Sequence, residues 1–187
     1  MKSSNIINPR ITSGFLKGRR IVVPKVENIR VPQDILKQAV FSILGEKVKE
    51  AEVLDIFAGS GSFGLEALSR GANHIDFVEK DIVALDSLKK TLFSLKIEDK
   101  CDLFHEEAIR YIGNTGKSYD LIFADPFFED LRHRFLFQNL AEILSPNGTI
   151  IFSHGKKLSI KDQISGTNLK LIETRRYGAA YVSFITN

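Results

Sequence analysis

Short apolar runs alternate along this chain with longer stretches in which apolar residues recur every three or four positions. A short apolar run is typical of a buried strand, and the longer period is typical of a helix that packs by one face. The runs predict strands at 53–57, 75–78, 102–104, 121–124 and 149–153. The periodic stretches predict helices near 33–44, 63–70, 82–95, 107–112 and 132–144, the last one ended by Pro146, Asn147 and Gly148. Strands that alternate with helices predict an α/β fold, in which helices cover both faces of a parallel sheet.

The end of the chain departs from this alternation. Residues 170–176 and 180–185 predict two strands that are joined at Tyr177 and Gly178. Because a parallel crossover needs a dozen or more residues, so short a join predicts an antiparallel pair. We therefore expect a mostly parallel sheet with a C-terminal antiparallel hairpin.

The segment after the first predicted strand carries the clearest sign of a ligand. It reads D-I-F-A-G-S-G-S-F-G over residues 55–64. Glycine permits positive φ and close approach of the backbone to a ligand, so Gly59, Gly61 and Gly64 predict a loop that holds a cofactor. Glu79 follows the first of these glycines by about twenty residues, as in dinucleotide-binding folds. The glycine spacing alone does not separate a nicotinamide site from an S-adenosylmethionine site.

Asp55 favours S-adenosylmethionine. A dinucleotide would bring its pyrophosphate near this carboxylate, and two like charges roughly 4 Å apart repel by about 4 kcal/mol at an effective dielectric constant of about 20. S-adenosylmethionine has no phosphate and carries an ammonium and a sulfonium, which a carboxylate attracts. The alternative is that Asp55 only caps the loop by accepting hydrogen bonds from backbone N–H groups.

A second candidate segment follows the fourth predicted strand, where Asp125 and Pro126 precede two phenylalanines. The carboxyl ends of parallel strands share one crevice, so Asp125 is expected to face the same cavity as Gly59. A carboxylate can accept a hydrogen bond from an amino group, proline stiffens the turn, and Phe127 or Phe128 offers a flat face for a base. The alternative is an ordinary Asp-Pro turn followed by core phenylalanine.

Other acids after strands complete the predicted cofactor site. Glu79 closes the second predicted strand, where a carboxylate can accept hydrogen bonds from both ribose hydroxyls. Glu107 and Ala108 follow the third strand and could meet the adenine edge, although Glu107 could equally be an acid that interacts with a helix dipole. The full predicted set of cofactor contacts is Asp55, Phe57, Ala58, Gly59, Gly61, Glu79, Lys80, Glu107, Ala108 and Asp125.

Two family resemblances rest on these segments. D-P-F-F at 125–128 resembles the (N/D)-P-P-(Y/F) signature of methyltransferases that modify planar nitrogens. Over most of its length the chain more closely resembles the bacterial 16S ribosomal RNA guanine-N2 methyltransferase family. That resemblance is carried by R-I-T-S-G-F-L-K-G-R-R-I-V-V-P at 10–24, the block from D-I-F-A-G-S-G to S-R-G at 55–71, V-E-K-D at 78–81 and R-Y-G at 176–178, and by Arg30, Asp34 and Phe41 between them.

The chain departs from the family pattern at three places. Phe127 replaces the second proline of the signature, Pro32 lies one place from the family's proline, and Ile35 stands where the family usually has arginine. The first departure bears on how the acceptor is positioned, and the other two bear on contact with the substrate.

The resemblance implies a Rossmann-like, seven-stranded class I methyltransferase sheet and S-adenosylmethionine as cofactor. It implies methyl transfer to the exocyclic N2 of a guanine in 16S ribosomal RNA, at guanine 966. Asp125 and Pro126 would then be catalytic, with Phe128 stacked on the base. Adenine N6 or a protein glutamine remains an alternative acceptor, and a non-catalytic RNA-binding module remains an alternative function.

Composition agrees with a compact enzyme. A chain of 187 residues with 43% hydrophobic residues can bury one core, so we expect a methyltransferase domain at 33–187 preceded by a basic extension at 1–32. The single cysteine, Cys101, suits a reducing cytoplasm. Residues 1–10 have no long apolar run and no apolar stretch is long enough to span a bilayer, so we expect neither a signal peptide nor a membrane-spanning segment. The four histidines lack ligand-like spacing, so no metal is expected. We expect a cytoplasmic monomer whose partner is ribosomal RNA or the small ribosomal subunit.

The net charge of +3 is too small to indicate RNA binding, but its distribution is informative. Residues 1–30 contain seven basic residues and one acid, Glu27. Such a segment could neutralise phosphates without reading sequence, or could be a solvated arm with no partner. The predicted RNA contacts are Arg10, Lys17, Arg19, Arg20, Arg30 and Arg132.

Overall fold

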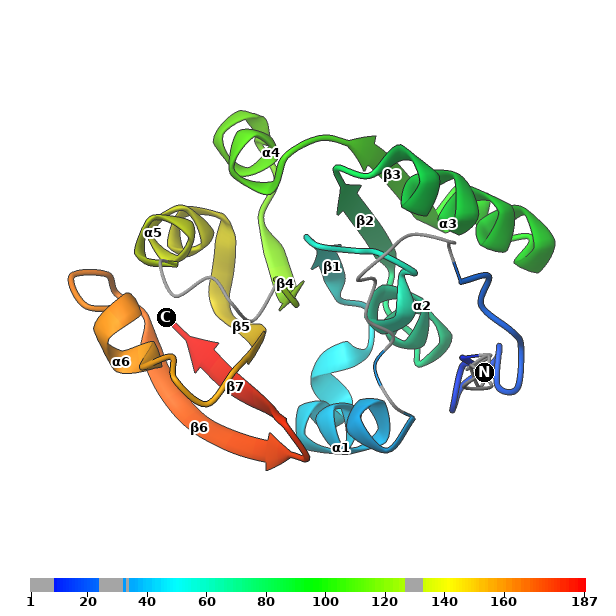
Figure 1. Ribbon diagram of the computed structural model, residues 1–187. Coiled ribbons are helices and arrows are strands. Elements are labelled where there is room, and N and C mark those ends of the chain that lie inside the picture. The colour runs from blue at the N-terminus through cyan, green and yellow to red at the C-terminus, as the bar shows by residue number, and fades with distance from the viewer. Residues whose placement is uncertain (1–8, 24–31, 33, 127–132) are drawn as a thin grey trace, which may run out of the picture.

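The computed structural model describes residues 9–23, 32, 34–126 and 133–187 (Figure 1). In this part of the chain, seven strands form one sheet in the order β3-β2-β1-β4-β5-β7-β6. The first five are mutually parallel, and β7 is antiparallel to both β5 and β6. The strands are β1 Glu52–Asp55, β2 His74–Glu79, β3 Cys101–His105, β4 Tyr119–Ala124, β5 Leu144–His154, β6 Lys170–Tyr177 and β7 Ala180–Thr186. The expected fold class, including the C-terminal hairpin, is confirmed.

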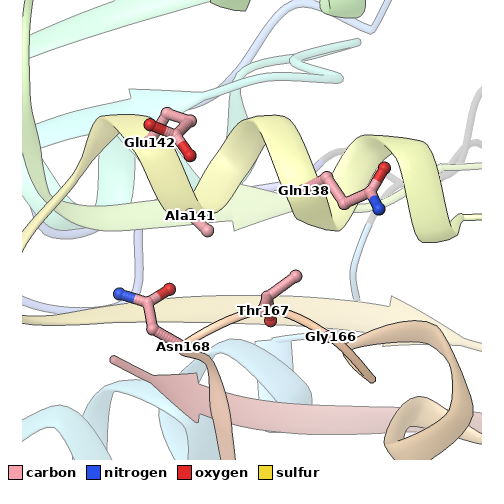
Figure 2. A pocket seen from close by; sticks show the side chains of 6 residues that line it. All are labelled: Gln138, Ala141, Glu142, Gly166, Thr167 and Asn168. Carbon is pink, nitrogen blue, oxygen red and sulfur yellow. The ribbon is translucent and has the colours of Figure 1, made fainter.

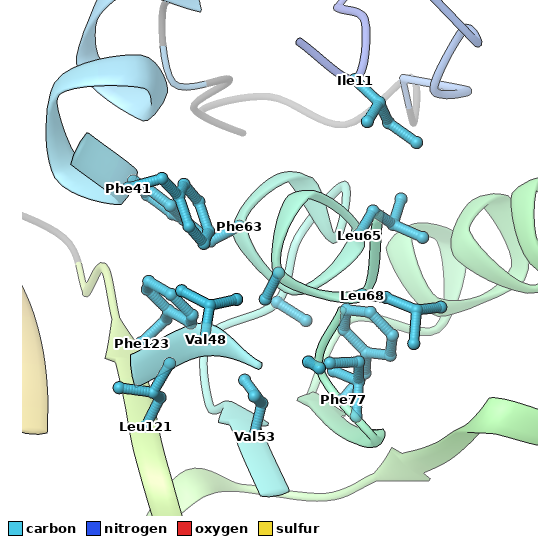
Figure 3. Packing of buried hydrophobic residues seen from close by; sticks show 14 of the residues in the cluster. Ile11, Phe41, Val48, Val53, Phe63, Leu65, Leu68, Phe77, Leu121 and Phe123 are labelled. Carbon is cyan, nitrogen blue, oxygen red and sulfur yellow. The ribbon is translucent and has the colours of Figure 1, made fainter. Parts of the chain in front are cut away.

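Helices cover both faces of the sheet. They are α1 Asp34–Leu44, α2 Ser62–Ser69, α3 Ile82–Leu95, α4 Ala108–Asn114, α5 Arg134–Ile143 and α6 Ile160–Gln163, with short 3₁₀ turns η1 Gly45–Val48 and η2 Glu98–Lys100. One apolar cluster joins α1, α2 and α3 to the sheet, and Figure 3 shows Phe41, Phe63 and Phe123 meeting in it. A second cluster packs α4, α5 and α6 against the other face. The central strands β1, β2 and β4 and the second half of β5 are thus buried on both sides, which explains their nearly continuous apolar sequence, whereas the outer strands β3 and β6 are partly exposed.

The register of the central strands determines where the candidate site lies. Asp55, the last residue of β1, pairs with Phe77 of β2 on one side and with Phe123 of β4 on the other. Glu79 and Asp125 each lie two residues beyond those partners. Three acids from three separate strands therefore emerge together at the carboxyl edge of the sheet.

The prediction for the end of α5 was partly wrong. The helix ends at Ile143, as Pro146 requires, but β5 begins at once, with Leu144 paired to Tyr119. The register then shifts, and Asn147 takes a φ of 64°. Pro146, Asn147 and Gly148 therefore form an irregularity inside a strand, because proline and a positive φ interrupt pairing without ending it.

Residues 9–23 fold back on themselves and pack beside α2 and α3 (Figure 1). Arg10 and Arg20 form an isolated antiparallel bridge, and the amide of Ile11 donates to the carbonyl of Arg19 at 3.0 Å. Ile11, Leu16 and Ile21 are buried in the same cluster as α2, as Figure 3 shows for Ile11. This part of the basic extension thus shares its core with the parallel sheet.

A buried carboxylate holds this segment in place. Glu66 of α2, which is 0% exposed, accepts hydrogen bonds from the amide and hydroxyl of Thr12, both at 2.7 Å. Arg70 donates to the same carboxylate at 2.8 Å, and the ammonium of Lys37, also fully buried, lies 3.8 Å away. Lys37 in turn donates to the carbonyl of Arg10 at 2.5 Å. Because removing one partner from a buried ion network leaves an uncompensated charge, the segment and α2 depend on each other.

Gly14→Ala is expected to destabilise the chain more than Gly18→Ala. Both glycines have a left-handed backbone, with φ of +77° and +82°, so both substitutions carry a strain of about 1–2 kcal/mol. At Gly14 the new Cβ would also overlap the carbonyl oxygen of Ser69, whereas at Gly18 nothing lies within 4 Å. Urea unfolding measures the difference. Equal losses in the two variants would contradict the docking of this segment on α2.

Candidate active site at the carboxyl edge of the sheet

The loop between β1 and α2 turns sharply over the end of β2. The amide of Ala58 donates to the carbonyl of Val78 at 3.1 Å, and the amide of Gly61 donates to the carbonyl of Ala58 at 2.6 Å. Gly59 and Gly61 have φ values of 51° and 71°, a conformation that favours glycine. The loop is thus held to the sheet by its own backbone, as a cofactor-approach loop requires.

Two of the glycines also have a packing role. The spacing in the sequence did not distinguish this role from close approach of the backbone to a ligand. A Cβ at Gly61 would lie 2.5 Å from Cδ1 of Leu88 in α3, and a Cβ at Gly64 would overlap the ring of Phe77. Gly64 lies inside α2, so its absent side chain lets that helix sit directly on β2. Gly59 and Gly61 remain in the loop itself.

Asp55 is buried at the centre of the site. Its Oδ2 accepts a hydrogen bond from the amide of Gly64 at 3.0 Å, so the loop-capping interaction is present. Burial raises the pKa of Asp55 to about 8, and the charges of Asp125 and Glu79 add to the increase while the bond from Gly64 opposes it. The carboxyl of Asp55 is thus mostly protonated at neutral pH in the chain without a bound cation.

Glu79 joins the glycine loop to the end of β2. Its Oε2 accepts from the amide of Gly59 at 2.8 Å, and its Oε1 accepts from the amide of Asp81 at 2.8 Å. Asp81 in turn caps α3 by accepting from the amides of Val83 and Ala84. An ionised carboxylate has about four lone-pair positions, so Glu79 keeps capacity for ligand hydroxyls after these two bonds.

Lys80 directly follows β2, and Glu107 and Ala108 lie one strand further out, after β3. Lys80 and Glu107 are exposed, and the ammonium of Lys80 lies 3.6 Å from Oε1 of Glu107. Glu107 directly precedes α4, and its side chain makes no capping bond to the helix. Ala108 is buried as the first residue of α4. An exposed pair of this kind contributes little to stability, so both side chains can rearrange around a ligand.

Asp125 and Pro126 directly follow β4, and Asp125 is partly exposed while Pro126 is buried. The effect of Asp125 on the pKa of Asp55 places the two carboxyls in one electrostatic environment. Phe127, Phe128 and Arg132 lie outside the described residues, as does Arg30. Their predicted roles therefore stay predictions.

Sequence reasoning missed an aromatic group beside this loop, at the ends of β5 and β7. His154 is buried as the last residue of β5, its ring lies 5.9 Å from that of Tyr181, and burial lowers its pKa. Nδ1 donates to the carbonyl of Gly155 at 2.9 Å, and Nε2 lies 2.8 Å from the hydroxyl of Ser183, which can donate to a neutral ring. The available signal was that His154 ends the strand next to β4.

Four of the six predicted RNA contacts lie on the N-terminal segment. Arg10, Lys17, Arg19 and Arg20 are exposed there, and Arg19 donates to the carbonyl of Ser94 at the end of α3, at 3.3 Å. The structure therefore gathers these four on one segment beside α3, separate from the acids at the carboxyl edge.

A hollow of about 390 Å³ lies between α5 and the loop before β6. Figure 2 shows Gln138 and Ala141 of α5 facing Thr167 and Asn168 across it. None of the predicted site residues lines this hollow. The acids at the carboxyl edge thus form a separate site.

His74, Asp76 and Asp102 form a possible metal-ligand group at the opposite, amino edge of the sheet, with ligand atoms within 4.8 Å of one another. The ammonium of Lys117 lies 2.7 Å from Oδ2 of Asp76 and 3.5 Å from Oδ2 of Asp102. Asp76 also accepts a hydrogen bond from the hydroxyl of Tyr119 at 2.6 Å. A lysine thus supplies the positive charge within this group.

Comparison with known proteins decides which family has this fold and this site. The model of the family described as "Conserved hypothetical protein 95" matches residues 9–186. The chain belongs to this family. Ribosomal RNA small subunit methyltransferase D of Escherichia coli K12 is 32% identical over 139 residues, which cover 74% of this chain and 68% of that protein. The proposed rRNA methyltransferase YlbH of Bacillus subtilis is 28% identical over 93% of this chain and 96% of its own length.

Solved structures agree with this membership. The proposed methylase HI0767 of Haemophilus influenzae superposes with a TM-score of 0.79 at 28% identity, covering 96% of this chain and 98% of that one. The family resemblance and the class I methyltransferase fold are therefore confirmed. Among the described residues, no helix has the length and apolar character needed to cross a bilayer.

In the original chain Asp55 is expected to make the free energy of unfolding fall as pH rises, and in Asp55→Asn this fall is expected to disappear. Between the ordinary pKa of 3.8 and the folded value of about 8, the folded chain keeps a proton that the unfolded chain has released. Stability without ligand therefore falls as pH rises through this window, by an amount on the order of a few kcal/mol, and is level above it. Asparagine has no such proton but can still accept the bond from Gly64.

Urea unfolding at about pH 5 and about pH 8 measures this slope. Asp99→Asn, at an exposed acid, is the matched control and is expected to behave like the original chain. A slope that is unchanged in Asp55→Asn would show that Asp55 titrates normally.

Proposed function

We propose that this chain transfers a methyl group from S-adenosylmethionine to the exocyclic N2 amino group of a guanine in 16S ribosomal RNA, at guanine 966. The observation that carries the proposal is the convergence of Asp55, Glu79 and Asp125 around a glycine loop, in a chain of the family that includes ribosomal RNA small subunit methyltransferase D. The convergence supports a cationic methyl donor, and the relatives support ribosomal RNA as the acceptor.

The residues at the carboxyl edge fit S-adenosylmethionine. The pKa of Asp55 is raised mainly by burial, to which the charges of Asp125 and Glu79 add, and a cation there would stabilise the ionised carboxyl. A dinucleotide would add negative charge at the same place. The site therefore selects a ligand with an ammonium and a sulfonium.

Each cofactor-binding residue has a distinct task. Asp55 attracts the ammonium, while Phe57, Ala58, Gly59 and Gly61 present loop backbone to the ligand. On the other side of the loop, the free lone pairs of Glu79 accept from the ribose hydroxyls, with Lys80 beside it. Glu107 and Ala108 follow β3, the neighbour of β2, so they contact the edge of the adenine ring.

Asp125 and Pro126 position the acceptor. S-adenosylmethionine supplies a methyl group made electrophilic by its sulfonium. The carboxylate of Asp125 accepts a hydrogen bond from the guanine amino group and turns the nitrogen lone pair toward that methyl, which is an effect of geometry. A carboxylate is too weak a base to ionise the amino group first. The N–C bond therefore forms as the S–C bond of the donor breaks, and the amino proton leaves to solvent during or after this step. Phe128 stacks on the base, which contributes roughly 1–3 kcal/mol.

The basic N-terminal segment binds the RNA backbone. Arg10, Lys17, Arg19 and Arg20 are exposed, and Glu66 holds their segment at a fixed place on the fold. Arg30 and Arg132 extend the same role. Cationic side chains of this kind neutralise phosphates and bind without reading sequence, so the base contacts at Asp125 supply the selectivity.

Asp125→Ala is expected to abolish methyl transfer while cofactor binding persists. The substitution removes the acceptor that orients the amino group but leaves Asp55, Glu79 and the loop in place. The assay incubates the chain with labelled S-adenosylmethionine and 16S ribosomal RNA from cells that lack this gene, followed by mass spectrometry of the nucleosides. The original chain is expected to form N2-methylguanosine.

The same assay separates the other acceptors. N6-methyladenosine as product would reject guanine, and absence of transfer to RNA by the original chain would reject the RNA methyltransferase function. Calorimetry with S-adenosylmethionine controls for folding of Asp125→Ala. Retained turnover in that variant would remove Asp125 from the chemistry.

Binding of S-adenosylmethionine near pH 7 is expected to release close to one proton from Asp55. The group with a pKa of about 8 is mostly protonated there, and a bound cation lowers that pKa, so affinity rises as pH approaches 8. Calorimetry in two buffers of different ionisation enthalpy measures the proton. Asp55→Asn is expected to release no such proton. Any proton that the ligand itself gains or loses is the same for both proteins, so it cancels in the comparison. Equal proton counts in both would contradict the assignment.

A further inference from the structure

One side of α3 faces the N-terminal segment. The amide of Val22 donates to the hydroxyl of Thr91 at 3.1 Å, and Arg19 donates to the carbonyl of Ser94 at 3.3 Å. Residues three or four apart on a helix lie on the same side, so Val83, Ser87, Lys90 and Ser94 form one row next to this contact. We refer to these four residues as the α3 flank.

The α3 flank leads from the basic segment to the candidate active site. Its distal end, Ser94, contacts Arg19, whereas Val83 lies in the first turn of α3, two residues after the N-cap Asp81. The amide of Asp81 donates a hydrogen bond to the carboxylate of Glu79, which also accepts one from the amide of Gly59 in the glycine loop. The rise of the helix makes the flank roughly 16 Å long, a distance that a few nucleotides of one strand cover.

The chemistry of the exposed side chains fits a nucleic acid strand. Lys90 is exposed, and among the described residues no carboxylate lies within 4.0 Å of its ammonium. Phe93, one turn from Lys90, is 75% exposed, and Val22 and Val83 are 43% and 48% exposed. An aromatic face beside cations is the usual platform for a single strand, because every base can stack on it.

The distal half of this path is positively charged. Arg19, Arg20 and Lys17 lie at its distal end, and Lys90 lies in its middle. Acids lie in the half nearer the active site, where Asp81 caps α3 and Asp86, one turn before Lys90, does not pair with Lys90. An acidic protein surface would find the same cations, but the exposed aromatic ring and the direction of the row toward the acceptor site favour RNA.

We propose that a single strand of the substrate RNA runs along the α3 flank, with a phosphate at Lys90 and a base stacked on Phe93, between the basic segment and the active site. This proposal rests on the proposed function and adds the path of the substrate. The contact at Lys90 is to the backbone and carries no sequence information.

Lys89 provides a matched control. It is the preceding residue, is equally basic and exposed, and lies about 100° around the helix, further from the N-terminal segment than Lys90, although Phe93 lies one turn from both lysines. Lys89→Ala and Lys90→Ala change the net charge equally, so a difference between them reports local contact. Both side chains are exposed, which leaves the core intact.

The test measures binding of the full chain to 16S ribosomal RNA and to oligouridine by fluorescence anisotropy over a range of salt concentrations. Loss of one phosphate contact on a single strand is expected to reduce the slope of log affinity against log salt by about 0.7 in Lys90→Ala and not in Lys89→Ala. Phe93→Ala is expected to bind roughly fivefold more weakly or worse. For methyl transfer, KM for RNA is expected to rise in Lys90→Ala, while kcat and cofactor affinity stay unchanged.

Each outcome has a separate meaning. Equal salt slopes in the original chain, Lys89→Ala and Lys90→Ala would overturn the path. Equal decreases of the slope in the two lysine variants would also overturn it, because overall charge would then explain the effect. If the original chain methylates guanine while these slopes are equal, the proposed function stands and the path fails. If the chain binds RNA through Lys90 but transfers no methyl, the proposed function fails and the path stands. Absence of RNA binding by the original chain would overturn both.

Discussion

The structure depends on one constraint, which is the parallel alignment of β2, β1 and β4. Because these strands are adjacent and in register, whatever follows each of them meets at one edge. Here that rule gathers the carboxyls of Asp55, Glu79 and Asp125, and like charges in a buried place are unfavourable. The chain meets this cost by keeping a proton on Asp55 and by giving Glu79 two backbone donors. The grouping of carboxyls that destabilises the chain without ligand stabilises a bound cation.

The glycine loop belongs to the packing of the fold as much as to the ligand. Gly61 and Gly64 let the loop and α2 approach Leu88 and Phe77 without a side chain between them. That approach in turn brings the amide of Gly64 to Asp55. The same glycines therefore serve both close packing and approach to the cofactor. For this reason the glycine spacing predicted where the site lies but did not separate the packing role from the ligand role.

The sequence predicted the elements that depend on periodicity and the site that depends on topology. Buried strands gave continuous apolar runs, and the short join at Tyr177 and Gly178 required a hairpin, so the sheet and its acids could be placed. Contacts between residues distant in sequence could not be placed. The bond between Thr12 and Glu66 spans 54 positions, and nothing local marks Glu66 as buried rather than as a solvated acid of a helix. The irregularity at Asn147 was missed for a related reason, since Pro-Asn-Gly is typical of a turn and only pairing with β4 makes it part of a strand.

The buried helix α2 connects the two halves of the proposed reaction. Its first turn follows directly from the glycine loop, through Gly61, and its last residue, Ser69, accepts hydrogen bonds from the amides of Phe15 and Leu16. All eight of its residues are buried, so it moves only with the core around it. The separation between the donor loop and the basic segment is thus set by a rigid element about 12 Å long. If the proposed function is correct, a substrate held by that segment meets the methyl donor at a distance that this helix sets.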